Sequence, residues 1–368
     1  MNHDFEGSAI VYCQGAFTTP YGKTAHGLVR RSHRYRILSV IDASCAGRDA
    51  DSILVGGASG IPVVASLDEA CAAAAAAGLQ PTHLIFGLAP DGGRLTGAQR
   101  EDLLAAVHRG LHLVAGLHDF LSDDEAIVAA ARQHGVTLTD VRKPPPRPEL
   151  HGFSGKIEEV MSFKIAVLGT DSALGKRTTA WLVVDALKAA GRTVEMIGTG
   201  QTAWLQGARY SMVLDTLVND FVAGELEHAA WTAWNEQRPD FLVVEGQGSL
   251  MNPAYPGGFE ILAATRPDAV ILQHAPGRED YDGFPGYPIQ PIEQQIQAIE
   301  LISGRPVIAI TLNHEGLSPE EAGRAAEDLQ ARTGLPVCDP LRGSLAPVIE
   351  RASELALARV GKLEGARL

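Results

Sequence analysis

Short apolar runs alternate with amphipathic stretches of helical length along most of this chain. In the first half, Tyr35–Ile41 and His83–Phe86 have the length and composition of buried strands. Ser66–Glu69 forms a capping box, which predicts an alanine-rich helix ending at Gly78, and Ser122–Glu125 predicts a second capped helix. Strands separated by helices of this length favour parallel sheets with helices on both faces. We therefore expect an α/β protein.

The same alternation continues through the second half. The shorter strands expected in the first half are Pro62–Ala65, Leu111–Gly116 and Val136–Thr139. The strands expected in the second half are Lys164–Leu168, Thr193–Ile197, Phe241–Val244, Ala269–Gln273, Val307–Leu312 and Leu335–Cys338. A long helix is expected from about Val213 to Glu236, and Ser318–Glu321 forms a capping box with proline in its first turn.

A domain boundary interrupts this alternation at residues 142–155, RKPPPRPELHGFSG. Four prolines and little apolar periodicity predict a stiff, extended connector. We therefore expect one parallel-sheet domain at residues 1–143, a linker at 144–160 and a second parallel-sheet domain at 161–368. The first domain has no GxGxxG after its first strand, which disfavours NAD binding. Gly22–Lys23–Thr24 imitates the end of a phosphate loop, but Phe17 stands where the upstream glycine is required.

Composition narrows the class of protein. The chain has 368 residues and a net charge of −13, without a basic run, so nucleic acid and anionic membrane surfaces are not expected partners. Its four cysteines lack metal-ligand spacing, and the N-terminus lacks the basic residues of a signal peptide. No apolar stretch reaches membrane-spanning length. A cytoplasmic enzyme is expected, as a homo-oligomer whose subunit number the sequence does not reveal.

The stretch KIAVLGTDSALGKRTT, residues 164–179, carries the strongest chemical signal. A buried strand, a loop bounded by glycines and a helix together form a cradle in which backbone N–H groups and Lys176 bind phosphate oxygens. The strict nucleotide loop has four residues between its glycines and a hydroxyl directly after the lysine. Here five residues separate Gly169 from Gly175, and Arg177 follows Lys176, with Thr178 one place later. The loop is therefore expected to bind a polyphosphate, with its usual Mg²⁺ hydroxyl displaced.

Other candidate residues lie where expected strands end, because ligands of open parallel sheets bind at the carboxyl edge. Glu245 follows one such strand and can act as a general base, as a metal ligand or as a cap of its own loop. His274 follows another strand and is the second candidate base. Arg209 and Arg278 are loop guanidiniums that could bind a substrate carboxylate, although solvent exposure is the simpler expectation for each.

Several motifs resemble known families. GTDSALGK resembles the GTDTxVGKT loop of dethiobiotin synthetase and the related cobyrinate amidases. A closer resemblance, to the D-glutamate N-acetyltransferase family, extends over nearly the whole chain. This family was long catalogued only as a domain of unknown function. The motifs are GTDSALGKRTTA, IGTGQTAWLQG, NDFVAGELE, VVEGQGSLMNPAYPG, TGLPVCDPLRG, LHDFLSDD and DVRKPP. The resemblance implies a Rossmann-like N-terminal domain and a C-terminal phosphate-loop domain of the NTPase type.

The resemblance also implies acetyl transfer from acetyl-CoA to the amino group of D-glutamate. An acyltransferase needs no metal ion, and none is expected. Glu245 and His274 are the candidate catalytic residues, and Arg209, Ser249 and Arg278 are the candidates for substrate binding. The cofactor-binding candidates are Gly169, Thr170, Asp171, Ser172, Gly175, Lys176, Arg177, Thr178 and Asn313. Asn313 is included because the resemblance to dethiobiotin synthetase implies that an asparagine at this position contacts the adenine ring. Two alternatives remain open, a ligase that uses ATP with Mg²⁺ and a nucleotide sensor without catalysis.

Overall fold

The computed structural model describes residues 5–54, 57–89 and 91–365 and divides the chain into two compact units. Unit 1 contains residues 1–145 and 201–208, and unit 2 contains residues 146–200 and 209–368. Each unit is built on one parallel sheet with covering helices, which confirms the expected α/β class. Among the described residues, no helix combines the length and the apolar character needed to cross a membrane.

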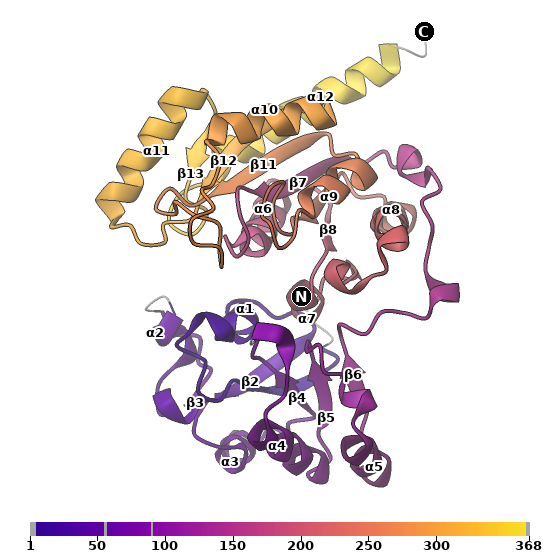
Figure 1. Ribbon diagram of the computed structural model, residues 1–368, viewed down its shortest axis with the longest axis vertical. Helices are drawn as coiled ribbons and strands as arrows, with labels where there is room; N and C mark the ends of the chain where they lie inside the picture. Colours follow the sequence, from indigo (N-terminus) through magenta and orange to yellow (C-terminus); the bar gives the residue numbers. More distant parts are fainter. Residues whose placement is uncertain (1–4, 55–56, 90, 366–368) are drawn as a thin grey trace. The chain divides into compact units, whose positions relative to one another are not determined.

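The sheet of unit 1 has six strands in the order β3-β2-β1-β4-β5-β6, the order of a Rossmann fold (Figure 1). Its strands are β1 (Gly7–Tyr12), β2 (Tyr35–Ile41), β3 (Val63–Val64), β4 (His83–Phe86), β5 (His112–Ala115) and β6 (Leu138–Asp140). Its helices are α1 (Lys23–Arg30), α2 (Ala50–Leu54), α3 (Leu67–Ala76), α4 (Gly97–His108), α5 (Glu125–His134) and α7 (Gln201–Gln206).

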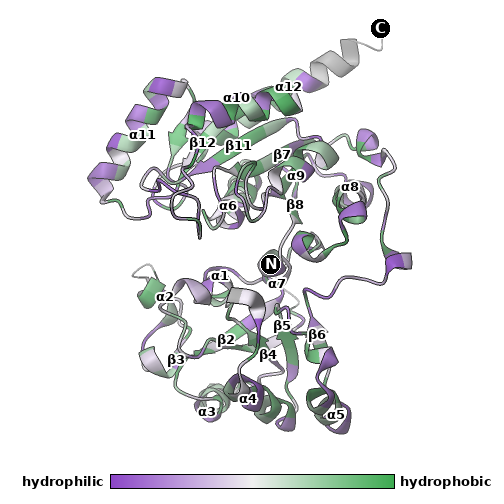
Figure 2. Ribbon diagram, viewed as in Figure 1, coloured by the Kyte–Doolittle hydropathy of each residue, from purple (hydrophilic) through white to green (hydrophobic). Residues whose placement is uncertain are grey.

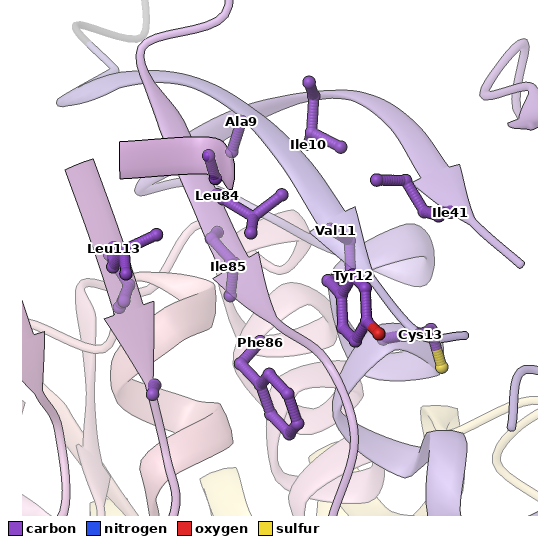
Figure 3. Close-up of a cluster of buried hydrophobic side chains, with 14 of the residues drawn as sticks. Ala9, Ile10, Val11, Tyr12, Cys13, Ile41, Leu84, Ile85, Phe86 and Leu113 are labelled. Carbon is purple, nitrogen blue, oxygen red and sulfur yellow. The ribbon is translucent and has the colours of Figure 1, made fainter. Parts of the chain in front are cut away.

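The core of unit 1 lies along β1, a strand absent from those expected above. Residues Ala9 to Cys13 are buried, and the Tyr12 ring stacks on Phe86 with centroids 5.6 Å apart (Figure 3). Phe17, in the loop before α1, is fully buried, and Lys23 is an exposed residue at the start of that helix. A large apolar side chain therefore fills the position where a phosphate loop would need glycine.

The sheet of unit 2 has seven strands in the order β13-β12-β11-β7-β10-β8-β9. Its strands are β7 (Phe163–Gly169), β8 (Val194–Gly198), β9 (Tyr210–Ser211), β10 (Phe241–Glu245), β11 (Ala269–His274), β12 (Val307–Leu312) and β13 (Val337–Cys338). Its helices are α6 (Lys176–Ala189), α8 (Asn219–Gln237), α9 (Gly258–Thr265), α10 (Ile292–Ser303), α11 (Pro319–Thr333) and α12 (Ala346–Gly365). Figure 2 shows hydrophilic colouring along much of α11 and hydrophobic colouring along strands such as β5 of unit 1.

Two local expectations are wrong. The helix expected from Val213 is interrupted, because a 3₁₀ turn ends at Thr216 and α8 begins only at Asn219, next to an acidic residue that suits a helix N-terminus. The second capping box does not form. Asp124 caps α5 instead, since its carboxylate accepts from two backbone N–H groups of the first turn. The capping boxes at Ser66 and Ser318 do place their hydroxyls as expected.

The segment 201–208 lies within the second half of the sequence but packs in unit 1. Leu205 is fully buried in the core of unit 1, and the Gln206 side-chain amide donates to the Gly27 carbonyl at 2.7 Å. The Arg34 guanidinium donates to the Trp204 carbonyl and lies 4.0 Å from the centroid of its ring. The chain therefore leaves unit 2 after Gly200 and returns to it at Arg209.

The proline-rich connector packs on α8. The Glu227 carboxylate, which is 2% exposed, accepts from the backbone N–H and hydroxyl of Ser154 and from the Ile157 N–H. Gly224 allows the connector to approach, because a Cβ at this position would lie 1.9 Å from the His151 carbonyl oxygen.

We expect Gly224→Ala to destabilise the protein by about 1–3 kcal/mol, because the added methyl group must displace the connector backbone. Gly323→Ala on α11 is the matched control, since a Cβ there meets nothing within 4 Å. That control should be neutral or stabilising by about 0.5–1 kcal/mol. Urea unfolding of both variants measures the difference, and equal stabilities would show that the connector is not held against α8.

Candidate functional site

The phosphate loop joins β7 to α6 in unit 2. Every residue of β7 is buried, and the loop turns through left-handed conformations at Ala173, with φ 53°, and Gly175, with φ 92°. Gly175 is the N-cap of α6 and provides no side-chain cap. The first N–H groups of α6, with Arg177 and Thr178 in its first turn, are therefore oriented as in an anion-binding helix terminus.

The stem of Lys176 passes between two glycines. A Cβ at Gly169 would lie 2.9 Å from Lys176 Cδ, and one at Gly246 would lie 3.0 Å from the same atom. The ammonium donates to the Asp171 carbonyl oxygen at 2.6 Å, and the residue is 6% exposed. Burial lowers the pKa of Lys176 to about 8, although the nearby Asp171 and Glu245 carboxylates favour its charged form.

The Asp171 carboxylate is completely buried and joins three loops. One oxygen accepts from the Ser172 N–H at 2.6 Å and from Asn252 Nδ2 at 2.8 Å. The other accepts from Arg278 Nη1 and from the Asp282 N–H, both at 2.8 Å. Protein donors thus engage both oxygens, so Asp171 organises the loop in this arrangement.

Arg278 holds the loop from the other side. Its guanidinium donates to Asp171 and to the Ser172 carbonyl oxygen at 2.8 Å, and to Glu315 at 2.6 Å. The side chain is 14% exposed, so the expectation of a solvent-exposed guanidinium is wrong. Binding of a substrate carboxylate by Arg278 would require exchange of one of these bonds.

Glu245 is the last residue of β10 and is 4% exposed. Its Oε2 accepts from the Thr199 N–H at 2.8 Å, and the Thr199 hydroxyl donates to the main-chain carbonyl of Glu245 at 3.0 Å. Burial raises the pKa of Glu245, and this effect is opposed by the Arg177 charge and by hydrogen bonds from Thr199 and Gly200. The raised pKa makes the carboxylate a stronger base than an exposed glutamate.

His274 ends β11, which pairs with β7 on the side opposite to β10. Its Nδ1 shares a hydrogen bond of 3.0 Å with the Thr170 hydroxyl, and the Thr170 N–H donates to the Gln273 carbonyl oxygen. Burial lowers the pKa of His274 to about 4, so the ring is neutral at neutral pH. Asn313, at the end of β12, donates to the Leu174 carbonyl oxygen at 3.1 Å. Both side chains therefore contact the phosphate loop.

The two other predicted substrate residues are placed differently. The Ser249 hydroxyl accepts from the Asn252 N–H at 2.8 Å, and its own N–H donates to the Tyr255 carbonyl oxygen, so it stabilises the loop after β10. Arg209 precedes the edge strand β9 and pairs with Glu236 of α8 at 2.6 Å. The structure thus places Ser249 in the loop after β10, which Asn252 joins to the phosphate loop. It leaves Arg209 at β9, three strands away from β7.

Sequence reasoning did not assign roles to Thr199, Asn252 or Gln273. Gln273 Oε1 accepts from the hydroxyls of Thr179 and Thr311, at 2.6 and 2.5 Å, and so links α6 to β12 across β11. Thr199 and Asn252 lie inside motifs quoted above, IGTGQTAWLQG and VVEGQGSLMNPAYPG, which is the one signal that could have identified them.

Comparisons with known families cover both units. A model described as a domain of unknown function, the DUF1611_C P-loop domain, matches residues 151–349. A second, described as the DUF1611_N Rossmann-like domain, matches residues 43–144. A crystal structure of a DUF1611 family protein from Anabaena variabilis is 29% identical and covers 95% of this chain and 100% of its own, with a TM-score of 0.85.

Two relatives share the name D-glutamate N-acetyltransferase. The protein from Tritonibacter scottomollicae is 31% identical over 284 residues, which are 75% of this chain and 81% of the relative. The protein from Pseudoalteromonas sp is 29% identical over 290 residues, which are 76% of this chain and 83% of the relative. Together with the two domain matches, these similarities confirm the resemblance seen in the motifs: this chain belongs to the DUF1611 family, with its Rossmann-like N-terminal domain and its P-loop C-terminal domain.

Proposed function

We propose that this chain transfers the acetyl group of acetyl-CoA to the amino group of D-glutamate. The observation that carries the proposal is the similarity to two relatives named for this activity. The similar stretch of 284 residues is longer than either unit, so it extends over parts of both. The chemistry of the carboxyl edge of the second sheet supports the same reaction.

The phosphate loop fits the phosphates of CoA. The uncapped start of α6 supplies N–H groups, and Lys176 and Arg177 supply positive charge beside them. Gly169 and Gly246 give the Lys176 stem the space that it needs to reach this position. We expect the ammonium to exchange its bond with the Asp171 carbonyl for one with a phosphate oxygen.

Glu245 is the proposed base. An amino acid carries an ammonium group at neutral pH, which must lose a proton before its nitrogen can attack a carbonyl carbon. The buried carboxylate accepts that proton, the nitrogen forms a bond to the acetyl carbon, and the bond from that carbon to sulfur breaks. The nitrogen loses its second proton as the amide forms, and the leaving thiolate takes up this proton to become the thiol. His274 is a weaker candidate, because its pKa of about 4 makes it a poor base and Thr170 engages its Nδ1.

The backbone around Glu245 supplies the proposed oxyanion donors. Among the N–H groups of Gly246, Gly248 and Ser249, which follow Glu245, that of Ser249 already donates to the Tyr255 carbonyl oxygen. The N–H groups of Gly246 and Gly248 are therefore the better candidates for stabilising negative charge on the acetyl oxygen.

The direct test is incubation of the purified protein with acetyl-CoA and D-glutamate in the presence of a chelator. We expect release of one thiol for each acetylated amino acid, and a slower reaction with L-glutamate. ATP hydrolysis that requires Mg²⁺ and is stimulated by an amino acid, with no CoA binding by calorimetry, would instead favour the ligase. Binding of a nucleotide without turnover of any of these substrates would favour the sensor.

Lys176→Ala should weaken acetyl-CoA binding by about 1.5–3 kcal/mol, because a charge-assisted hydrogen bond to phosphate is lost. Lys188→Ala is the matched control, since Lys188 is an exposed lysine in the last turn of the same helix. Calorimetric titration of both variants measures the effect. Equal affinity of the two variants for acetyl-CoA would contradict a role of Lys176 in cofactor binding.

Glu245→Gln preserves the shape of the side chain but removes its basicity. We expect kcat to fall by about 10²–10⁴, with acetyl-CoA affinity near that of the wild type. Glu327→Gln, at an exposed position of α11, should leave kcat unchanged. If Glu245→Gln lowers only thermal stability and keeps a normal kcat, the carboxylate is a loop cap and the base is another group.

A further inference from the structure

One cavity of unit 2 lies away from the phosphate loop. It has a volume of about 570 Å³, which falls within the range of small-molecule sites. Its floor is formed by the segments that enter β7 and β10, and its sides by α12 and by the C-terminal end of α8. The phosphate loop leaves the opposite, carboxyl end of β7, so the cavity is separate from the proposed active site.

The walls of this cavity are largely apolar. Phe163 and Phe241 pack edge to face with ring centroids 5.7 Å apart, and Trp234 lies on the α8 side. Met161 is 48% exposed and Leu357 is 63% exposed, so two large hydrophobic side chains of the lining remain open to water. An apolar ligand body would cover surface that otherwise stays hydrated.

Three arginines border the same cavity. Arg359 is already engaged, because its guanidinium donates to Asp268 at 2.8 Å and to the Ser162 carbonyl oxygen at 3.0 Å. Arg192 and Arg238 have no carboxylate partner among the residues that the structure describes. Arg238 stacks over the Trp234 ring, 3.6 Å from its centroid, and its Nη2 donates to Asn235 Oδ1 at 3.4 Å, so the guanidinium lies beside the aromatic wall.

The described lining contains one carboxylate beside these arginines, that of Asp240. Its Oδ2 accepts from the N–H and the hydroxyl of Thr193, both at 2.9 Å, and it forms no ion pair with Arg192 or Arg238. In a chain with a net charge of −13, two arginines without carboxylate partners at one apolar cavity form a local site for a single anionic group. Arginine binds a carboxylate through two parallel N–H bonds, which fits such a group.

We propose that this cavity binds a free carboxylate with a hydrocarbon body, with the carboxylate at Arg192 and Arg238 and the hydrocarbon against Trp234 and Leu357. The site is independent of the proposed acetyl transfer. Its ligand contacts the loop that enters β7 and the helix α12, which Arg359 fastens to that loop. Occupation therefore stabilises unit 2 from the end of the sheet opposite to the phosphate loop.

The test uses the full-length protein and the fluorescent aromatic sulfonate 8-anilinonaphthalene-1-sulfonate, which combines an apolar body with one anionic group. We expect saturable binding of this probe, displacement by decanoate and much weaker displacement by decan-1-ol. Arg192→Ala and Arg238→Ala should each weaken decanoate binding about tenfold, as expected for one charge-assisted hydrogen bond. Arg324→Ala, an exposed position on α11, is the matched control and should bind decanoate like the wild type.

Leu357→Asp provides an independent variant, because it removes part of the apolar wall and adds a repelling charge at an exposed position. We expect decanoate to displace the probe from this variant at least about tenfold less well. Equal displacement by decanoate and decan-1-ol would overturn the proposal. Wild-type affinity for decanoate in folded Arg192→Ala and Arg238→Ala proteins, as judged by thermal unfolding, would overturn it as well.

Discussion

The hydrogen bonds of one buried carboxylate, that of Asp171, hold the proposed active site together. They join the phosphate loop to the loop after β10 through Asn252 and to the segment after β11 through Arg278 and the Asp282 N–H. A carboxylate without solvent exposure is costly unless its charge is balanced and both oxygens accept hydrogen bonds. Because four donors meet these needs, three separate loops have one stable arrangement. Lys176, which bonds to the main chain of the same residue, takes its position from that arrangement.

Because of the same network, the charged groups at the carboxyl edge of the unit 2 sheet have different roles. Arg278 and Asp171 neutralise each other and face protein atoms, so they contribute rigidity. In the proposed function, Lys176, Arg177 and the N-terminus of α6 bind the phosphates of the cofactor. Glu245 is held by a hydrogen bond from the Thr199 N–H, and burial raises its pKa although the Arg177 charge opposes this effect. The proposed phosphate binding and the proposed proton transfer therefore rely on different residues that share one scaffold.

Much of the fold and of the phosphate loop could be predicted from the sequence because both are local signals. The apolar run Lys164–Leu168, the glycines and the lysine all act within one strand, one loop and one helix. The contacts of Asp171 and Glu245 could not be predicted, since Asn252, Arg278 and Thr199 are distant in sequence and meet only in the folded sheet. Asp124 displaced the expected cap because a nearby carboxylate competed successfully with a hydroxyl. The alternation of strands and helices also does not predict where the small helix α7 packs. This helix follows β8 of unit 2 in the sequence, but its Leu205 is buried in the core of unit 1.

The placement of α7 has a consequence for the synthesis of the chain. During translation the strands of the unit 1 sheet leave the ribosome first. Residues 201–208 belong to the same unit but emerge only after β7, α6 and β8. Until then the pocket that receives Leu205 is open, and the Gly27 carbonyl has no bond from Gln206. The N-terminal unit is therefore completed in the middle of the translation of the second, and neither half cut at residue 145 contains a whole domain. The position in the sequence where the two halves meet, near residue 145, is therefore not the boundary between the two folded units.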